Sequence, residues 1–243
     1  MLQVPDHIAR ANIATQDVKF AWDEWRTKSY YWDVPQALFD RLNALSDDAS
    51  MSLALAIAEW VVHRFSRLDN DPFALQFLEA AWAGTVHPAY CIYTETVDDE
   101  WRGPVRGPLA VTIAIVNDGL FCRDNDPELA TRACWMHRLA IHVLPDTADF
   151  DRWFENSVQR LERFHPRTPA PVPTSFFDLN LASMRPVPRQ AFEPGFAYAP
   201  DRAPALVDAF LKSLDVRANP CLRSPEELAA ISELKMAPYA FSS

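Results

Sequence analysis

The sequence predicts an all-α protein, a globular helical bundle with two similar helix-turn-helix hairpins and a proline-rich irregular arm packed on it. Apolar residues recur at three- and four-residue steps over several long segments, which is the spacing of one helix face. The motif Asp-Asn-Asp-Pro occurs at 69–72 and again at 124–127, each time between two such segments. The chain has 243 residues, of which 49% are hydrophobic and 12% aromatic, as is usual for a folded domain.

Two helices are expected before the first hairpin. Val18, Ala21, Trp22 and Trp25 fall on one side of a helix over 14–31. A second helix is expected over 35–45.

The first hairpin is predicted over 50–86. Its first helix, 50–68, carries Leu53, Ile57, Trp60 and Phe65 at helical spacing. The second begins at Asp71-Pro72, because Asp caps a helix and Pro suits its first turn. It continues to about residue 84.

A second copy of this hairpin is predicted over 107–145. Residues 109–114 repeat the pattern of 53–58 with an offset of 56, and the Asp-Asn-Asp-Pro motifs repeat with an offset of 55. The alternative is that the motif is a common helix entry and the alanine-rich match arose by chance. Two copies are too few for a solenoid, so a globular pack is expected.

The remaining elements complete three regions. A helix over 146–164 closes a helical domain of residues 1–165. Nine of the 20 prolines lie between 166 and 204, so the region 166–203 is expected to be a non-helical arm, and its aromatic residues favour packing on the body. In 204–243, helices are expected over 204–214 and after Ser224, where Ser-Pro-Glu-Glu is a capping-box signature. Residues 90–94 could form one extended segment.

Charge and composition limit the partners. The net charge of −10 and the pI near 5 oppose binding to nucleic acid, which needs clustered basic residues. The N-terminus lacks the features of a secretory signal, and no apolar run approaches the roughly 20 residues of a membrane span. We therefore expect a cytoplasmic protein without membrane insertion. The four cysteines are dispersed and are expected to be buried thiols.

Several common chemistries are improbable. The five glycines cannot form a dinucleotide or phosphate-binding loop, and the signatures of zinc proteases, kinases, serine hydrolases and calcium loops are absent from the sequence. We therefore expect no cofactor and no catalytic residue of a known class.

The alternative prediction is a metal-dependent helical enzyme. Glu59 and His63 are four residues apart on one predicted helix and could supply two ligands, with His137 and His142 as further candidates. The competing interpretation is a surface Glu–His pair and two partly buried histidines. The duplicated aspartates could likewise bind a cation, but helix capping explains them better.

The connector over 87–108 is the candidate partner-binding segment. It is long for a connection between helices and combines aromatic with acidic side chains. The candidate residues are Tyr90, Tyr93, Asp98, Asp99, Glu100 and Trp101. The alternative is that these aromatics only anchor the connector to its own domain.

Taken together, these features favour a non-catalytic protein-binding accessory protein, such as an adaptor, a chaperone-like factor or an antitoxin- or immunity-type inhibitor. The expected partner is another protein, and self-association stays open. The alternative is an enzyme with an unrecognised helical active site, possibly metal-dependent through Glu59 and His63.

Overall fold

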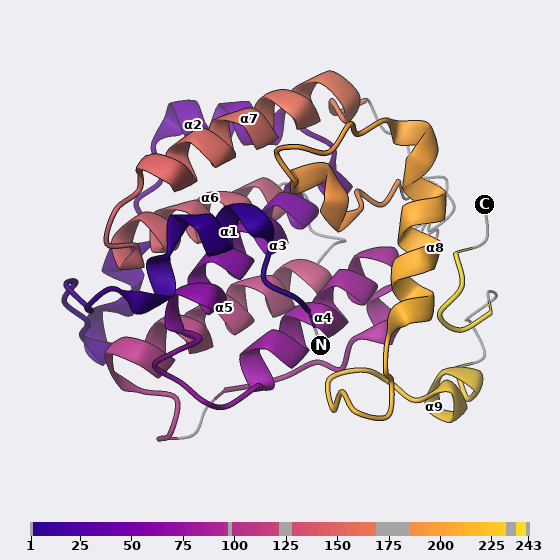
Figure 1. Cartoon of the computed structure of the whole chain (residues 1–243), viewed down its shortest axis with the longest axis horizontal. Coiled ribbons are helices and arrows are strands. Elements are labelled where there is room, and N and C mark those ends of the chain that lie inside the picture. Colours follow the sequence, from indigo (N-terminus) through magenta and orange to yellow (C-terminus); the bar gives the residue numbers. More distant parts are fainter. Residues whose placement is uncertain (1, 97–98, 122–127, 169–184, 232–236, 242–243) are drawn as a thin grey trace.

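The fold was taken from a computed structural model. It describes residues 2–96, 99–121, 128–168, 185–231 and 237–241. Within these ranges the regular elements are all helices, and the all-α prediction is confirmed. Helices surround one central helix (Figure 1). None of the helices in the described ranges has the length and apolarity needed to cross a membrane.

Two helical hairpins form the body. The first joins α3 (Asp47–Phe65) to α4 (Phe73–Val86), and the second joins α5 (Gly103–Phe121) to α6 (Glu128–Val143). Both first helices have 19 residues. Helix α3 packs most extensively on α6 and also contacts α4 and α5, so the hairpins are interleaved. The duplication itself stays a prediction.

Helix α3 is the centre of the molecule. The Ser46 hydroxyl accepts a hydrogen bond from the Ala49 amide and caps its first turn. Every residue from Ala49 to Phe65 is buried, so the helix has no solvent face. A helix that is apolar on nearly all sides is typical of a protein interior. The single apolar face that residue spacing indicates for this helix is therefore only part of its buried surface.

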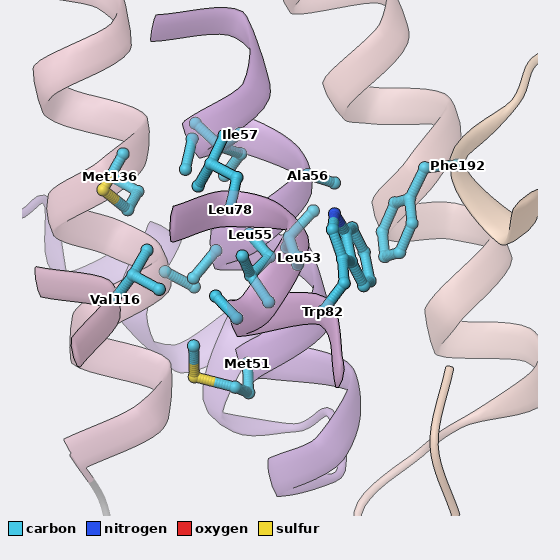
Figure 2. Close-up of a cluster of buried hydrophobic side chains, with 14 of the residues drawn as sticks. Met51, Leu53, Leu55, Ala56, Ile57, Leu78, Trp82, Val116, Met136 and Phe192 are labelled. Carbon is cyan, nitrogen blue, oxygen red and sulfur yellow. The ribbon is translucent and has the colours of Figure 1, made fainter. Parts of the chain in front are cut away.

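The core forms where α3 meets its neighbours. Leu53, Leu55 and Ile57 of α3 lie among side chains from the surrounding elements, as Figure 2 shows. The labelled neighbours are Leu78 and Trp82 of α4, Val116 of α5, Met136 of α6 and Phe192 of the arm. One hydrophobic core therefore includes residues from both hairpins and from the arm.

The predicted helix over 14–31 is wrong. The chain forms α1 (Asp6–Ala11), a 3₁₀ turn η1 (Ile13–Thr15), an irregular stretch, and a 3₁₀ helix η2 (Glu24–Tyr30). Asn12 ends α1 in a left-handed conformation with φ of 51°. The buried Arg64 then takes the carbonyl oxygens of Ile13 and Asp17 as acceptors, both at 3.0 Å. These long-range bonds hold the segment in a non-helical path.

The turn between α3 and α4 follows the capping prediction. The Asp69 carboxylate accepts from the Asp71 amide, and the Asp71 carboxylate accepts from the Phe73 amide. Arg106 of α5 also pairs with Asp69 at 3.0 Å and Asp71 at 3.4 Å. The first motif thus begins α4 and ties it to the second hairpin. The second motif, 124–127, lies outside the described residues.

Helices α2 (Gln36–Asn43) and α7 (Ala148–Phe164) lie over the body. Arg41 of α2 joins them through its guanidinium, which is 2.6 Å from Glu155 and 2.7 Å from Glu162. Both helices agree with the predicted positions.

The described part of the arm, 185–203, packs on the helical body. It contains the turns η5 (Arg189–Phe192) and η6 (Pro200–Arg202). Trp153 of α7 donates through its indole nitrogen to the Phe192 carbonyl at 2.9 Å, and Val187 and Phe192 are buried. Residues 169–184 of the predicted arm lie outside the described ranges.

The C-terminal part begins with α8 (Ala203–Ser213) and includes the short α9 (Pro225–Ala229). The predicted capping box is confirmed, since Ser224 and Glu227 exchange both hydrogen bonds. Residues 90–94 form no strand, but Cys91 makes an isolated bridge with Leu222.

Candidate functional site

The connector is shorter than the predicted range 87–108, because α5 already begins at Gly103. Tyr90 is fully buried, and its ring stacks on Tyr239 with centroids 4.7 Å apart. The Ile92 amide donates to the Cys221 carbonyl at 2.8 Å. This half of the connector is thus anchored to the C-terminal region, and Tyr90 has no exposed surface to offer a partner.

The other connector residues are more accessible. Tyr93 is 50% exposed and packs edge-on against Phe121. Asp99 and Glu100 are exposed, and Trp101 is half-buried against Phe73. Asp98 lies outside the described residues. Asp99 is 2.8 Å from Arg102 and Glu100 is 3.8 Å from Arg106, so the described acidic side chains have basic neighbours in the same part of the chain.

Glu59 is enclosed in the core and fully engaged. The Trp82 indole nitrogen donates to Glu59 Oε1 at 2.6 Å. Arg189 of the arm donates through Nε to Oε1 at 2.6 Å and through Nη2 to Oε2 at 2.8 Å. This bidentate pair balances the buried charge, and it occupies both oxygens that a metal ion would need.

His63 lies one turn after Glu59 and is only 2% exposed. Neither of its ring nitrogens has a hydrogen-bond partner among the described residues. Burial lowers the pKa of His63 to about 4, although the Glu59 carboxylate opposes the shift. His63 is therefore a neutral imidazole at pH 7.

The other two candidate histidines lie in different surroundings. His137 packs against Phe154 with ring centroids 4.2 Å apart, and burial lowers its pKa to about 4. His142 lies 2.9 Å from the Ala21 carbonyl and stacks on Tyr30. Within the described ranges, no group of three or more His, Cys, Asp or Glu side chains is arranged to hold a metal ion.

Arg189, the partner of Glu59, was not singled out from the sequence. It lies in the arm, 130 residues from Glu59. Beside it, Glu193 is 3.4 Å from the Nδ1 atom of His7, and this contact lowers the pKa of Glu193. The arm and the N-terminal segment, residues 2–21, thus cover the polar end of α3, where Glu59, His63 and Arg64 lie. The sequence signal that could have pointed to Arg189 is that the arm combines arginines with many apolar residues.

Besides Tyr93, the exposed aromatic residues of the described ranges lie in residues 22–32. Trp25 in η2 is 95% exposed, and Trp32 is 48% exposed. Trp32 stacks on Trp135 of α6 with centroids 5.6 Å apart, and the Lys28 ammonium lies 4.0 Å from the centre of the Trp32 ring. We call residues 22–32 the aromatic segment.

Local bonds hold the aromatic segment in place. The Asp23 carboxylate accepts from the Trp25 amide at 2.9 Å, which caps η2. Glu24 accepts from the Trp22 indole and from the Gly103 amide at the start of α5. The Trp22 ring lies so close to Gly107 that a Cβ atom there would clash with it. Trp25 therefore projects from a backbone that is fastened to the bundle.

The described cysteines are poor nucleophiles. Cys91, Cys134 and Cys221 are buried and free. Burial raises the pKa of Cys91 and of Cys134 to about 12, so both remain thiols at pH 7.

Comparison of the chain with protein-family models, with curated proteins and with solved structures gave no match.

Proposed function

We propose that this protein is a non-catalytic accessory protein that binds another protein through its aromatic segment. The observation that supports this most directly is Trp25, a tryptophan that is 95% exposed on a capped and hydrogen-bonded turn. Tryptophan is the residue type most enriched among interface hot spots. Because the backbone that carries Trp25 is already held in place, binding costs little further backbone entropy.

The charges of the aromatic segment indicate the chemistry of the partner. Arg26, Lys28 and Asp23 are exposed, whereas the Glu24 carboxylate accepts bonds from inside the protein. The exposed charges of the segment therefore have an excess of one positive charge, on a chain of net charge −10. A partner with an apolar recess for Trp25 and carboxylates at the rim of that recess would match it in shape and charge.

The connector supplies a matched control surface. Tyr93 packs on Phe121 at the last residue of α5, whereas the aromatic segment is tied to Gly103 at the first. A helix of 19 residues is about 28 Å long. Tyr93 is therefore an exposed aromatic residue beside the opposite end of α5 from the aromatic segment, and the two surfaces can be tested separately.

The direct test is site-specific photo-crosslinking in the native host. A photoreactive phenylalanine analogue at position 25 should give one discrete crosslinked protein, and the same analogue at position 93 should not give that product. The crosslink at position 25 should weaken when Arg26 and Lys28 are both replaced by Glu. The identified partner, once purified, should bind the parent chain and lose at least tenfold in affinity for Trp25→Ala.

Fold integrity is checked by urea unfolding. Because Trp25 is almost fully exposed, Trp25→Ala should change the free energy of unfolding by less than about 0.5 kcal/mol. The proposal is wrong if positions 25 and 93 give the same products, or if the purified partner binds Trp25→Ala as tightly as the parent.

A further inference from the structure

A pocket of about 460 Å³ lies between the N-terminal segment and the arm. Residues 3–6 and Arg10 line it on one side, and Arg189 and residues 193–196 line it on the other. The volume falls within the range of about 300–1,000 Å³ that is usual for small-molecule sites. None of residues 22–32 contributes to the lining, so the pocket is separate from the aromatic segment.

Arg189 has unused hydrogen-bond donors at this pocket. Its Nε and Nη2 atoms donate to the two carboxylate oxygens of Glu59, and Nη2 also donates to the Gln3 carbonyl at 2.7 Å. Because the guanidinium is planar, one N–H of Nη1 lies on the same edge as the N–H that points to Gln3, a residue of the pocket lining. Nη1 makes no hydrogen bond to another described residue and, unlike the ring nitrogens of His63, it keeps accessible surface. A molecule in the pocket can therefore accept a hydrogen bond from Arg189.

Arg10 of α1 adds a second guanidinium to the lining. Its Nε atom donates to the Asp6 carbonyl at 3.1 Å, which directs the side chain back along its own helix. Both of its Nη atoms lack a hydrogen bond to any other residue in the described ranges, and the side chain is exposed. Two cationic groups thus contribute to one pocket.

Two carboxylates balance these cations. Glu193 lies 3.4 Å from His7 through Oε2, whereas its Oε1 accepts no hydrogen bond from a described residue. The contact with His7 lowers the pKa of Glu193 most, burial opposes the shift, and Arg189 and Arg10 lower the pKa further. Glu193 is therefore ionised at pH 7 and lies within the field of both arginines. The second carboxylate is that of Asp6, which is exposed.

The rest of the lining is partly apolar. Val4 is 45% exposed although it is a large hydrophobic residue, and Phe196 is half-buried with the Arg202 guanidinium 5.1 Å from the centre of its ring. Pro5 and Pro194 add rigid apolar surface beside the charged groups. The pocket therefore combines donors, acceptors and an apolar wall.

We propose that this pocket binds a small zwitterion, an α-amino acid with an apolar side chain. Its carboxylate accepts hydrogen bonds from Arg189 Nη1 and from Arg10, since guanidinium groups match carboxylates in shape and charge. Its ammonium group pairs with Glu193 Oε1 and with Asp6.

The charges of the lining select this class of ligand. A simple anion would meet two carboxylates, and a simple cation would meet two guanidinium groups, whereas a zwitterion complements both pairs. The apolar side chain of the ligand packs on Val4 and Phe196.

The test titrates L-leucine into the full chain at pH 7 and follows the Val4 methyl and Phe196 ring resonances by NMR. Two analogues of similar shape each lack one charge: isocaproate keeps the carboxylate, and isoamylamine keeps the ammonium group. Leucine should bind at least tenfold more tightly than either analogue, because accessible ion pairs contribute little singly and the ligand must make both.

Two variants assign the charges to their partners. Arg10→Gln should weaken the binding of leucine and isocaproate severalfold and leave isoamylamine unaffected. Asp6→Asn should weaken leucine and isoamylamine and leave isocaproate unaffected. Both side chains are exposed, so urea unfolding should show little change in stability. Arg217→Gln, at an exposed arginine that does not line the pocket, is the matched control and should bind all three probes as the parent does.

The proposal is overturned if leucine does not shift the Val4 and Phe196 resonances, or if either analogue binds as tightly as leucine. It is also overturned if Arg10→Gln and Asp6→Asn have the same effect on both analogues, because the pocket would then not distinguish the two ends of the ligand. Each of these results is independent of partner binding through Trp25.

Discussion

The polar end of α3 and the aromatic segment show opposite relations between residue type and position. Glu59, His63 and Arg64 are polar residues inside the core, at 2%, 2% and 0% exposure. Trp25 is a large apolar residue that is 95% exposed. Polar groups are normally buried only with partners, and large apolar groups are normally covered. Both regions break the usual pattern, but for different reasons.

At the end of α3 the buried polar groups mostly serve the fold. Glu59 joins α3 to α4 and to the arm, and Arg64 joins α3 to the N-terminal segment. Of these three side chains, only His63 makes no hydrogen bond to another residue that the structure describes. In the aromatic segment Asp23 and Glu24 fix the backbone, while Trp25 faces outward. Glu59, whose residue type suggested a chemical role, is thus a structural residue. Trp25, whose residue type suggested a place in the core, is exposed and available for binding.

The largest expected effect comes from breaking the Glu59–Arg189 pair. Arg189→Met leaves the Glu59 carboxylate buried without its counterion, so the free energy of unfolding should fall by about 3–5 kcal/mol in urea denaturation. Glu59→Gln should have a similar effect while keeping an acceptor for the Trp82 indole. The double variant should lose less than the two single losses added together.

The matched control is Glu162→Gln, which weakens a more exposed pair with Arg41 and should cost less than about 1 kcal/mol. Additive losses at Glu59 and Arg189 would mean that the two side chains do not act as a pair. The conclusion that the polar groups at the end of α3 serve the fold would then be wrong for Glu59.

The second effect is acid sensitivity from neutral buried histidines. The pKa values of His63 and His137 are about 4 in the folded protein, against about 6.5 in an unfolded chain. Between pH 6.5 and 4 the unfolded state binds more protons, so stability falls as the pH is lowered. The slope should approach about 1.4 kcal/mol per pH unit for each histidine.

Urea titrations at several pH values test this directly. The slope should be smaller in His63→Phe and in His137→Phe than in the parent. Between pH 7 and 8 these histidines add no pH dependence to the free energy of unfolding in the parent or in either variant. The groups that act on these rings are Glu59, Arg189 and His7 around His63, with Asp151 and Arg138 around His137. An unchanged slope in the double variant would show that neither histidine is held neutral by burial.

Local signals explain which elements could be predicted from the sequence. The starts of α4 and α9 were predictable because they depend on neighbouring residues, Asp71 and Ser224. The start of α5 was not, since this helix begins at Gly103, before the predicted residue 107. The segment 14–31 was predicted wrongly because its path depends on Arg64, about 50 residues later, and on Gly103 of α5. The spacing of apolar residues within a segment gives no information about a distant side chain, such as Arg64, that hydrogen-bonds to the backbone carbonyl oxygens of that segment.

The site was less predictable for the same reason. The spacing of Glu59 and His63 correctly puts them on one helix. The sequence gives no sign, however, that Arg189 forms a bidentate ion pair with the Glu59 carboxylate. Tyr90 and Tyr93 look alike in the connector, yet Tyr90 is covered by Tyr239 and Tyr93 is not buried. Which aromatic residue faces solvent is decided by distant segments.

The third effect is expected at Gly107, where a moderate change in stability should come with a larger effect on binding. A Cβ atom at this position would meet the Trp22 ring, so Gly107→Ala must displace the anchor of the aromatic segment. Overpacking costs about 1–3 kcal/mol, and the better helix propensity of Ala returns up to about 1 kcal/mol. Gly195→Ala, with open space around its new Cβ atom, is the matched control and should leave both stability and binding unchanged.

Crosslinking from position 25 should drop in Gly107→Ala, because Trp25 is positioned through Trp22 and Glu24. If crosslinking stays at the parent level, Trp25 does not depend on its anchor at Gly107, and a fixed backbone is not what makes the aromatic segment a binding surface.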